Sequence, residues 1–194
     1  LTLQEVDAAS VQVVVNDPTD GEVYNQTYEL LDYSASDYYE YFFAPYEVQR
    51  ALTVMDLPPY ADATITITIA ESGATVKCGN CILGMQADIG YTQYGPRISI
   101  IDYSKKSVDS FGRYYVNQGS FAKRVTMDLW MHNSTVDYVF RTLAGVRSTP
   151  TVFVGDSRDN EFQSLTVFGI YRDFEITIPN PSISTCTVEL EGFV

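Results

Sequence analysis

One stretch carries most of the information about how this chain folds. It runs from Ile89 to Tyr171, and it contains AKRVTMDLWM at residues 122–131 followed by STVDYVFRTLAGVR at residues 134–147. In the first segment, apolar residues occupy every second position, which is the period of a β-strand with one buried face. These residues are Val125, Met127, Leu129 and Met131. The pattern predicts a long strand that leads directly into the next segment.

Residues 134–147 have the signals of an amphipathic helix. Asn133 or Ser134 can cap its N-terminus, and Asp137 is placed to complete a capping box from Ser134. Apolar residues recur at helical spacing and predict one buried face: Val136, Val139, Phe140 and Leu143. Thr149-Pro150 ends the pattern. We therefore expect one helix over 134–147.

Extended segments surround this strand and helix. They cover Ile98–Tyr103, Tyr114–Val116, Thr151–Gly155, Leu165–Ile178 and Ile183–Glu191. Their order around the helix predicts a second domain over 96–194, built as a β-rich sheet or split barrel with one α-helix. The boundary is expected near Tyr94-Gly95-Pro96, where the composition changes.

The residues before that boundary predict a different β arrangement. Short strand-like runs are separated by turn residues at Val11–Val15, Val23–Leu31, Ala63–Ala70 and Thr75–Met85. In the clearest of them, Ile65, Ile67 and Ile69 alternate with threonines. This spacing favours an antiparallel β-sandwich over 1–95, so the fold class is mainly β. Residues 1–15 have the sequence character of a segment inside a domain rather than of its beginning. We therefore expect this sandwich to be incomplete at its N-terminus.

Charge limits the partners of the chain. Among 194 residues, 25 are acidic and 12 are basic, which gives a net charge of −13. Such a surface repels phosphate backbones and anionic lipids, so we expect neither nucleic-acid binding nor membrane insertion. The sequence also has no apolar run long enough to cross a bilayer.

Cysteines form the sharpest local motif, Cys78-Gly79-Asn80-Cys81. Such a pair can bind zinc, cycle as a dithiol or close a small disulfide. A zinc site would need Cys186 and His132 as further ligands, from distant segments. We interpret the pair as two small residues flanking a turn, and we expect no metal and no cofactor.

Candidate catalytic groups are sparse. His132 lies before the predicted helix without a nucleophile motif, and we interpret it as a polar linker residue. Asp173 and Glu175 share one strand face and could form a glycosidase-like pair, but solvated carboxylates are the simpler interpretation. The oxygen-rich loops 17–21 and 156–161 lack full calcium-site spacing and are interpreted as surface turns. We therefore expect no enzymatic activity.

The tyrosine-rich segment from Tyr33 to Tyr46 has no clear period, and we predict strand and loop for it. Tyr38, Tyr39 and Tyr41 could stack on sugar rings and bind glycan. Tyrosines of this kind also occur in half-buried strands and subunit interfaces, and we favour that interpretation.

Several segments together resemble a family of tail proteins of tailed bacteriophages. The resemblance spans nearly the whole chain, and the segments that carry it are Val6–Ser10, Asp56–Ala61, Ile89–Gly95, Ile101–Lys106, Ser120–Arg124 and Phe168–Phe174. It implies a virion component of the tail tip or baseplate region, with other tail proteins as partners. The resemblance also implies a carbohydrate-binding-like β-sandwich ahead of the C-terminal half, as in some members of the family.

A second resemblance lies in topology. The predicted order of strands and one helix in the C-terminal half is similar to tail-tube and distal-tail hub folds. It implies a homo-oligomeric ring in which long strands pair or pack across subunits. The leading hypothesis is a non-enzymatic structural protein of the virion tail, made in the host cytoplasm. The alternatives are a module that binds host-surface carbohydrate and, third, an enzyme that degrades the host surface.

Overall fold

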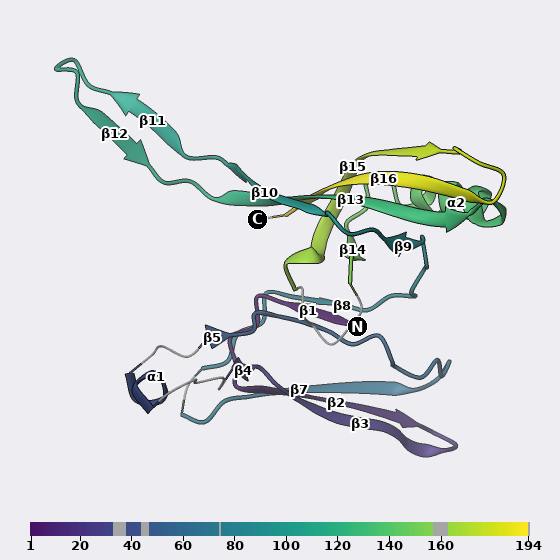
Figure 1. Cartoon of the computed structure of the whole chain (residues 1–194). Helices are drawn as coiled ribbons and strands as arrows, with labels where there is room; N and C mark the ends of the chain where they lie inside the picture. Colours follow the sequence, from purple (N-terminus) through teal and green to yellow (C-terminus); the bar gives the residue numbers. More distant parts are fainter. Residues whose placement is uncertain (33–37, 44–46, 74, 157–162, 194) are drawn as a thin grey trace. The chain divides into compact units, whose positions relative to one another are not determined.

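The computed structural model describes residues 1–32, 38–43, 47–73, 75–156 and 163–193 (Figure 1). Their architecture is mainly β, which confirms the predicted fold class. The chain divides into two compact units, Leu1–Met85 and Gln86–Val194. The predicted boundary at residue 95 lies ten residues too late, because strand β9 (Tyr91–Thr92) pairs with β13 (Phe121–His132) and so belongs to the second unit.

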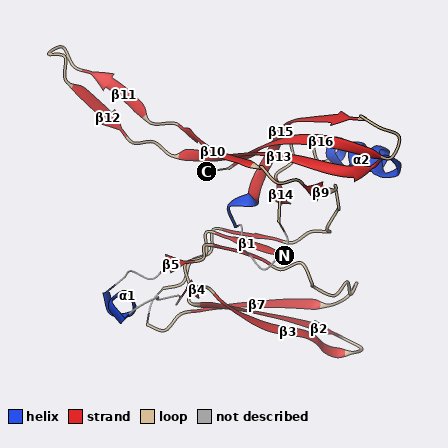
Figure 2. Ribbon diagram, viewed as in Figure 1, coloured by secondary structure: helices blue, strands red, loops and turns tan. Residues whose placement is uncertain are grey.

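The first unit is built from short antiparallel strands. They are β1 (Thr2–Gln4), β2 (Ser10–Asp17), β3 (Gly21–Glu29), β4 (Leu31–Asp32), β5 (Glu47–Val48), β6 (Ala51–Thr53), β7 (Thr64–Ala70) and β8 (Asn80–Ile82). Two three-stranded sheets result, in the orders β6-β1-β8 and β3-β2-β7, and β4 pairs with β5. Figure 2 shows the strands of the second sheet, β3, β2 and β7, side by side.

One hydrophobic core serves both of these three-stranded sheets. Leu3 of β1 and Leu52 of β6 are buried in it together with Val11 and Val13 of β2. The isoleucines of β7 pack against the same core while its threonines remain exposed, as the alternation predicted. The first unit is therefore the expected antiparallel sandwich.

The tyrosine-rich segment contains a helix that the sequence did not reveal. Helix α1 spans Tyr38–Phe43, between β4 and β5, which pair with each other. The prediction of strand and loop is wrong for these six residues. A helix of this length has fewer than two turns, so it is too short to display a hydrophobic period.

The second unit is organised around one curled antiparallel sheet. Its strands are β9 (Tyr91–Thr92), β10 (Arg97–Asp102), β13 (Phe121–His132), β14 (Thr151–Val154), β15 (Thr166–Thr177) and β16 (Ile183–Gly192). They lie in the order β10-β13-β16-β15-β14, and β9 also pairs with β13. Two further strands, β11 (Lys105–Val108) and β12 (Tyr114–Asn117), form a separate hairpin. The short helix η2 spans Gln163–Leu165.

Helix α2 (Val136–Gly145) packs against one face of this sheet. Its buried residues Val139 and Leu143 join a core that includes the alternating apolar residues of β13 and the buried residues of β16. The buried residues of these two strands are Val125, Met127, Leu129, Met131, Cys186, Val188 and Leu190. The predicted strand and helix are thus confirmed, with the helix ending two residues earlier than expected.

The predicted capping box is wrong. Residues Asn133–Thr135 form a 3₁₀ turn, η1, and the N-cap Thr135 makes no capping bond through its side chain. The side chain of Asn133 instead ties this turn to the β15–β16 connection. Its Nδ2 donates to the Asn180 carbonyl at 2.9 Å, and its Oδ1 accepts from Ser184 Oγ at 2.6 Å.

Phe140 also departs from the prediction that it is buried. Its side chain is 54% exposed, and its ring meets Phe174 edge to face, with ring centroids 5.9 Å apart. The apolar face of α2 is therefore wider than the part that its own sheet covers.

Candidate assembly surface

The most conspicuous feature of the second unit is the hairpin of β11 and β12, which projects from the β10–β13 end of the sheet (Figure 1). We call residues 103–120 the arm. All eight residues of its two strands are exposed. The arm thus makes strand pairs within itself but contributes nothing to the core of its own unit.

Local hydrogen bonds hold the tip of the arm. Asp109 Oδ1 accepts from the backbone N–H groups of Phe111 and Arg113, both at 2.8 Å. Gly112 adopts a φ of +78°, a left-handed conformation that glycine tolerates best. These residues therefore stabilise one particular turn at the tip of the arm.

Side-chain hydrogen bonds also stabilise the base of the arm. Asp102 Oδ1 accepts from both the backbone N–H and the hydroxyl of Ser104, and these bonds lower the pKa of the Asp102 carboxyl. Ser104 Oγ in turn accepts from the Gly119 N–H at 3.0 Å across the hairpin. A Cβ at Gly119 would lie 2.6 Å from the Tyr103 carbonyl oxygen, so this crossing requires glycine.

Side chains divide the arm into two unlike faces. Residues paired across the hairpin share a face, and successive residues alternate. One face is mainly apolar and consists of Lys106, Val108, Tyr114 and Val116. The ammonium of Lys106 lies 4.4 Å from the centre of the Tyr114 ring, a cation–π contact. The other face is polar and consists of Lys105, Ser107, Tyr115 and Asn117.

The apolar face is open to solvent. Tyr114 is 68% exposed and Val116 is 70% exposed, and Phe111 at the tip is 87% exposed. An isolated two-stranded hairpin is at best marginally stable in water, and contiguous exposed apolar surface usually marks an interaction site. The arm therefore has the character of one side of an interface.

The arm also differs in charge from the rest of the chain. It holds Lys105, Lys106 and Arg113 against the single carboxylate of Asp109, so its net charge is 3 − 1 = +2. The remaining residues then carry −13 − 2 = −15. A basic segment on an acidic protein is complementary to the surface of another copy of that protein.

Only part of the arm could be predicted from the sequence. The residue pattern predicted extended structure for Tyr114–Val116 and for the segment up to Tyr103, but not the hairpin between them. The available signals were the Asp-Ser-Phe-Gly turn at 109–112 and the alternation of Lys106 and Val108. They are weak because a strand exposed on both faces has no buried period.

The tyrosines proposed for glycan binding lie on α1. Tyr38 is 86% exposed and Tyr39 is 71% exposed, whereas the side chain of Tyr41 lies outside the described part. Phe42, four residues after Tyr38, shares its helix face and is 68% exposed. Exposed aromatic rings are thus present at this position, and the glycan hypothesis remains a prediction.

The cysteines lie in contrasting environments. Cys78 and Cys81 are exposed free thiols, and Cys186 is a buried one. Burial raises the pKa of Cys186 to about 11. Partial desolvation of its sulfur raises the pKa of Cys78 although the residue is exposed, and the nearby Cys81 contributes further. Within the described ranges, no three His, Cys, Asp or Glu side chains are grouped so that they could hold a metal ion.

The remaining candidate groups are distributed over surfaces. His132 ends β13, opposite Ile183 of β16. Asp173 and Glu175 are exposed on β15. Asp17 Oδ2 accepts from the backbone N–H groups of Thr19 and Asp20, so it stabilises a turn. Most of the second oxygen-rich loop, 157–161, lies outside the described residues.

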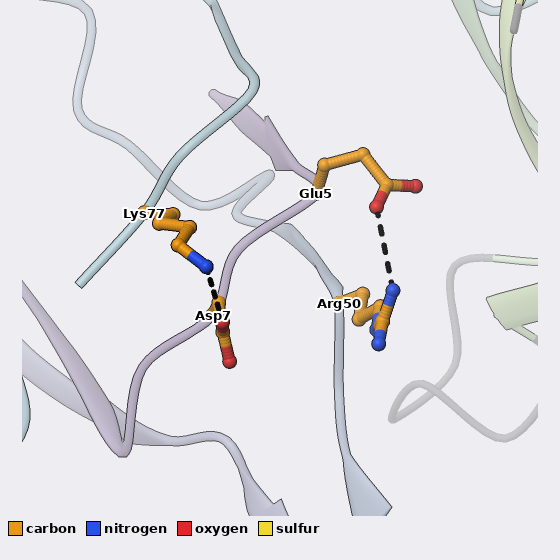
Figure 3. A network of polar contacts seen from close by, with 4 residues as sticks. All are labelled: Glu5, Asp7, Arg50 and Lys77. Atoms are coloured by element: carbon orange, nitrogen blue, oxygen red, sulfur yellow. Dashed lines mark ion pairs between the residues drawn. The ribbon is translucent and has the colours of Figure 1, made fainter. Parts of the chain in front are cut away.

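Two ion pairs of the first unit belong to its framework. Arg50 pairs with Glu5 at 3.8 Å, and Lys77 pairs with Asp7 at 3.7 Å (Figure 3). All four side chains are more than half exposed, so each pair contributes at most about 1 kcal/mol. They connect the residues that follow β1 to neighbouring segments of the first unit.

Comparison with known proteins does not assign this chain to a family. No protein-family model matches the chain, and no curated protein matches it. None of the described helices has the length and apolar character that spanning a bilayer requires.

Proposed function

We propose that this protein is a structural, self-associating component of a bacteriophage tail, located in the distal tail or baseplate region. The observation that carries the proposal is the arm, whose specified turn and base present an apolar face that its own unit does not cover. A surface of this kind is expected in a protein whose role is to be incorporated into an assembly.

The phage context comes from the sequence resemblance, and the mainly β architecture supports it. A curled sheet braced by one helix, preceded by a β-sandwich, has the order of elements that this resemblance implies. Under this proposal the partners are further copies of the chain and other tail proteins, and the location is the virion.

Two measurements test the proposal. Quantitative mass spectrometry of gradient-purified phage particles should find the chain at a fixed number of copies per particle. Mass photometry of the purified protein should show a discrete oligomer. Recovery of the chain only from infected-cell lysate, never from particles, would overturn its assignment to the virion.

A second candidate function is binding of host-surface glycan, as part of host attachment. The exposure of Tyr38 and Tyr39 favours it, since aromatic faces stack on sugar rings. Glycan-array binding should be lost in Tyr38→Ala and Tyr39→Ala variants while the oligomeric state is kept. Unchanged binding in both variants would exclude these residues as the glycan site.

A further inference from the structure

We infer that the arm of one copy adds to the open edge of β15 in a second copy of this chain. The inference rests on the proposed self-association and names the two surfaces that make it. It places strand β11 beside residues 170–177 of the neighbour, as an additional strand of that sheet.

The receiving edge follows from the strand pairing. β15 pairs with β16 along most of its length, from Gly169 to Thr177. On its other side it pairs with β14 only, and that pairing ends at Gly169. Among the described strands, none occupies the outer edge of β15 over residues 170–177. Such an edge exposes backbone donors and acceptors that favour pairing with another strand.

The outer face of the sheet beside this edge has more acidic than basic side chains, although the exposed Arg172 lies at the bulge next to Asp173. Asp173 and Glu175 point to this face and are exposed, and Asp173 lies directly opposite Glu189 of β16. Like charges opposite each other destabilise a sheet. No described basic side chain forms an ion pair with any of the three. A lysine on an added strand would offset this repulsion.

The inner face beside the same edge is apolar. Phe174 of β15 is partly buried and meets the ring of Phe140 from α2. Phe140 is 54% exposed. The rings of Phe174 and Phe140 therefore extend the apolar face of the core outward at this edge.

The two faces of the arm match the two sides of this edge. If β11 lies along β15, its apolar face, with Val108 and the paired Tyr114, adjoins Phe174 and Phe140. Its polar face then places Lys105 beside Asp173 and Glu175, where opposite charges attract across strands. The opposite orientation would bring Lys106 near the carboxylates, but it would also place Val108 and Tyr114 on the charged face. The apolar contacts therefore favour the first orientation, in which Lys106 stays over the Tyr114 ring.

This contact also has a consequence for assembly geometry. The arm and the β15 edge are different surfaces of the chain, so each copy can donate its arm to one neighbour and receive an arm from another. Repetition of such a head-to-tail contact builds a closed ring or a filament. The arm would join the sheets of adjacent copies into one continuous structure.

A charge-reversal series tests the inference. Lys105→Glu should raise the dissociation constant of the oligomer about tenfold. The double variant Asp173→Lys with Glu175→Lys should weaken association similarly. Combining Lys105→Glu with Glu175→Lys in one chain keeps the wild-type net charge of −13 and should recover most of the affinity. The dissociation constants are measured by sedimentation velocity over a concentration series.

Matched controls separate contact from net charge. Arg147→Glu makes the same charge change as Lys105→Glu at an exposed position after α2, and Asp62→Lys with Glu71→Lys repeats the edge reversal on the first unit. The controls should associate as the wild type does. Circular dichroism of every variant confirms that it is folded.

A cross-linking experiment gives a readout that does not depend on charge. In a background with Cys78→Ser and Cys81→Ser, a chain with Ser107→Cys is mixed with a chain carrying Glu175→Cys. A short bis-maleimide should join the two chains, whereas replacing Glu175→Cys by Glu71→Cys should abolish the product.

Each outcome has a defined meaning. Charge rescue together with the cross-link supports the inference. The wild type could be oligomeric while the charge reversals on the arm and on the edge leave the dissociation constant unchanged and no cross-link forms. That result would overturn the inference and leave the proposed function standing. A wild-type chain that is monomeric at all concentrations and absent from particles would overturn both.

Discussion

At the scale of single residues, the three cysteines differ mainly in access to solvent. Cys186 lies within the core of the second unit, next to Val188 and Leu190, while Cys78 and Cys81 are exposed in the first unit. Thiolates are the reactive species, so the buried thiol with a pKa of about 11 is the least reactive at neutral pH.

Iodoacetamide labelling tests this difference. At pH 8 the native chain should take two labels, and the third only after unfolding in denaturant. Because the pKa of Cys78 is raised, its labelling rate should continue to increase above the pH at which an ordinary thiol levels off. Peptide mass spectrometry locates the labels. Rapid modification of Cys186 in the native chain would contradict its burial.

The hydroxyl of Tyr24 is the group with the clearest pH dependence. It donates to Asp56 Oδ1 at 3.0 Å and also contacts the hydroxyl of Tyr28. Burial first, and these hydrogen bonds next, raise the pKa of Tyr24. A raised pKa in the folded state stabilises the fold below the unfolded value of about 10, and this contribution is lost as pH rises above it.

Denaturant unfolding of the wild type and Tyr24→Phe checks this contribution. At pH 8 the variant should be less stable by about 1 kcal/mol, because it loses the hydrogen bonds of the hydroxyl. Between pH 9 and 11 the wild type should lose more stability than the variant does. Equal losses in the two proteins would show that Tyr24 does not titrate with folding.

At the scale of elements, periodicity decided which predictions succeeded. β13 and β7 have one buried face, and their alternating residues predicted both strands correctly. The N-terminal cap of α2 was mispredicted because Asn133 bonds to Asn180 and Ser184, which lie 47 and 51 positions away. Tertiary partners of this kind leave no local signal.

The candidate site was less predictable than the fold. The arm was missed because both of its faces are exposed, and the apolar side of a strand is recognisable only when burial imposes a period. The open edge of β15 could not be predicted from the sequence because strand order depends on the whole sheet. The residues on these surfaces can be recognised as a candidate site only when the strand pairing is known.

Removal of the arm should separate assembly from folding. Replacing residues 103–120 by a two-residue Asn-Gly turn deletes no buried side chain, so the free energy of unfolding of the remaining sheet should change by less than about 0.5 kcal/mol. The shortened chain should be monomeric. Sedimentation velocity measures the assembly state, and thermal unfolding measures stability. An oligomer without the arm would show that association uses another surface.

At the scale of the whole molecule, the chain contains two units with separate cores. The first core includes Leu52 and the second includes Leu190, and none of the described residues belongs to both. A unit with its own core is expected to fold independently.

Fragments 1–85 and 86–194 test that expectation. Each should unfold cooperatively by itself. Leu190→Ala should destabilise the second fragment by about 2–5 kcal/mol, and Leu52→Ala should do the same to the first. The exposed Leu83, changed to alanine, serves as a control with little effect. A fragment that fails to unfold cooperatively would show that its core is not self-sufficient.

The surfaces that we propose for assembly all lie in the second unit. They are the arm, the open edge of β15 and the outer face beside it, and we propose that they pair between copies. The proposed place of such copies is the distal tail of a phage particle.

Electron cryo-microscopy of the native assembly would show directly whether the arm joins one copy to the next. We expect copies arranged head to tail, with the β11–β12 arm of each copy lying along residues 170–177 of its neighbour. Arms that remain free in solvent, or copies joined through surfaces that exclude the arm, would contradict it.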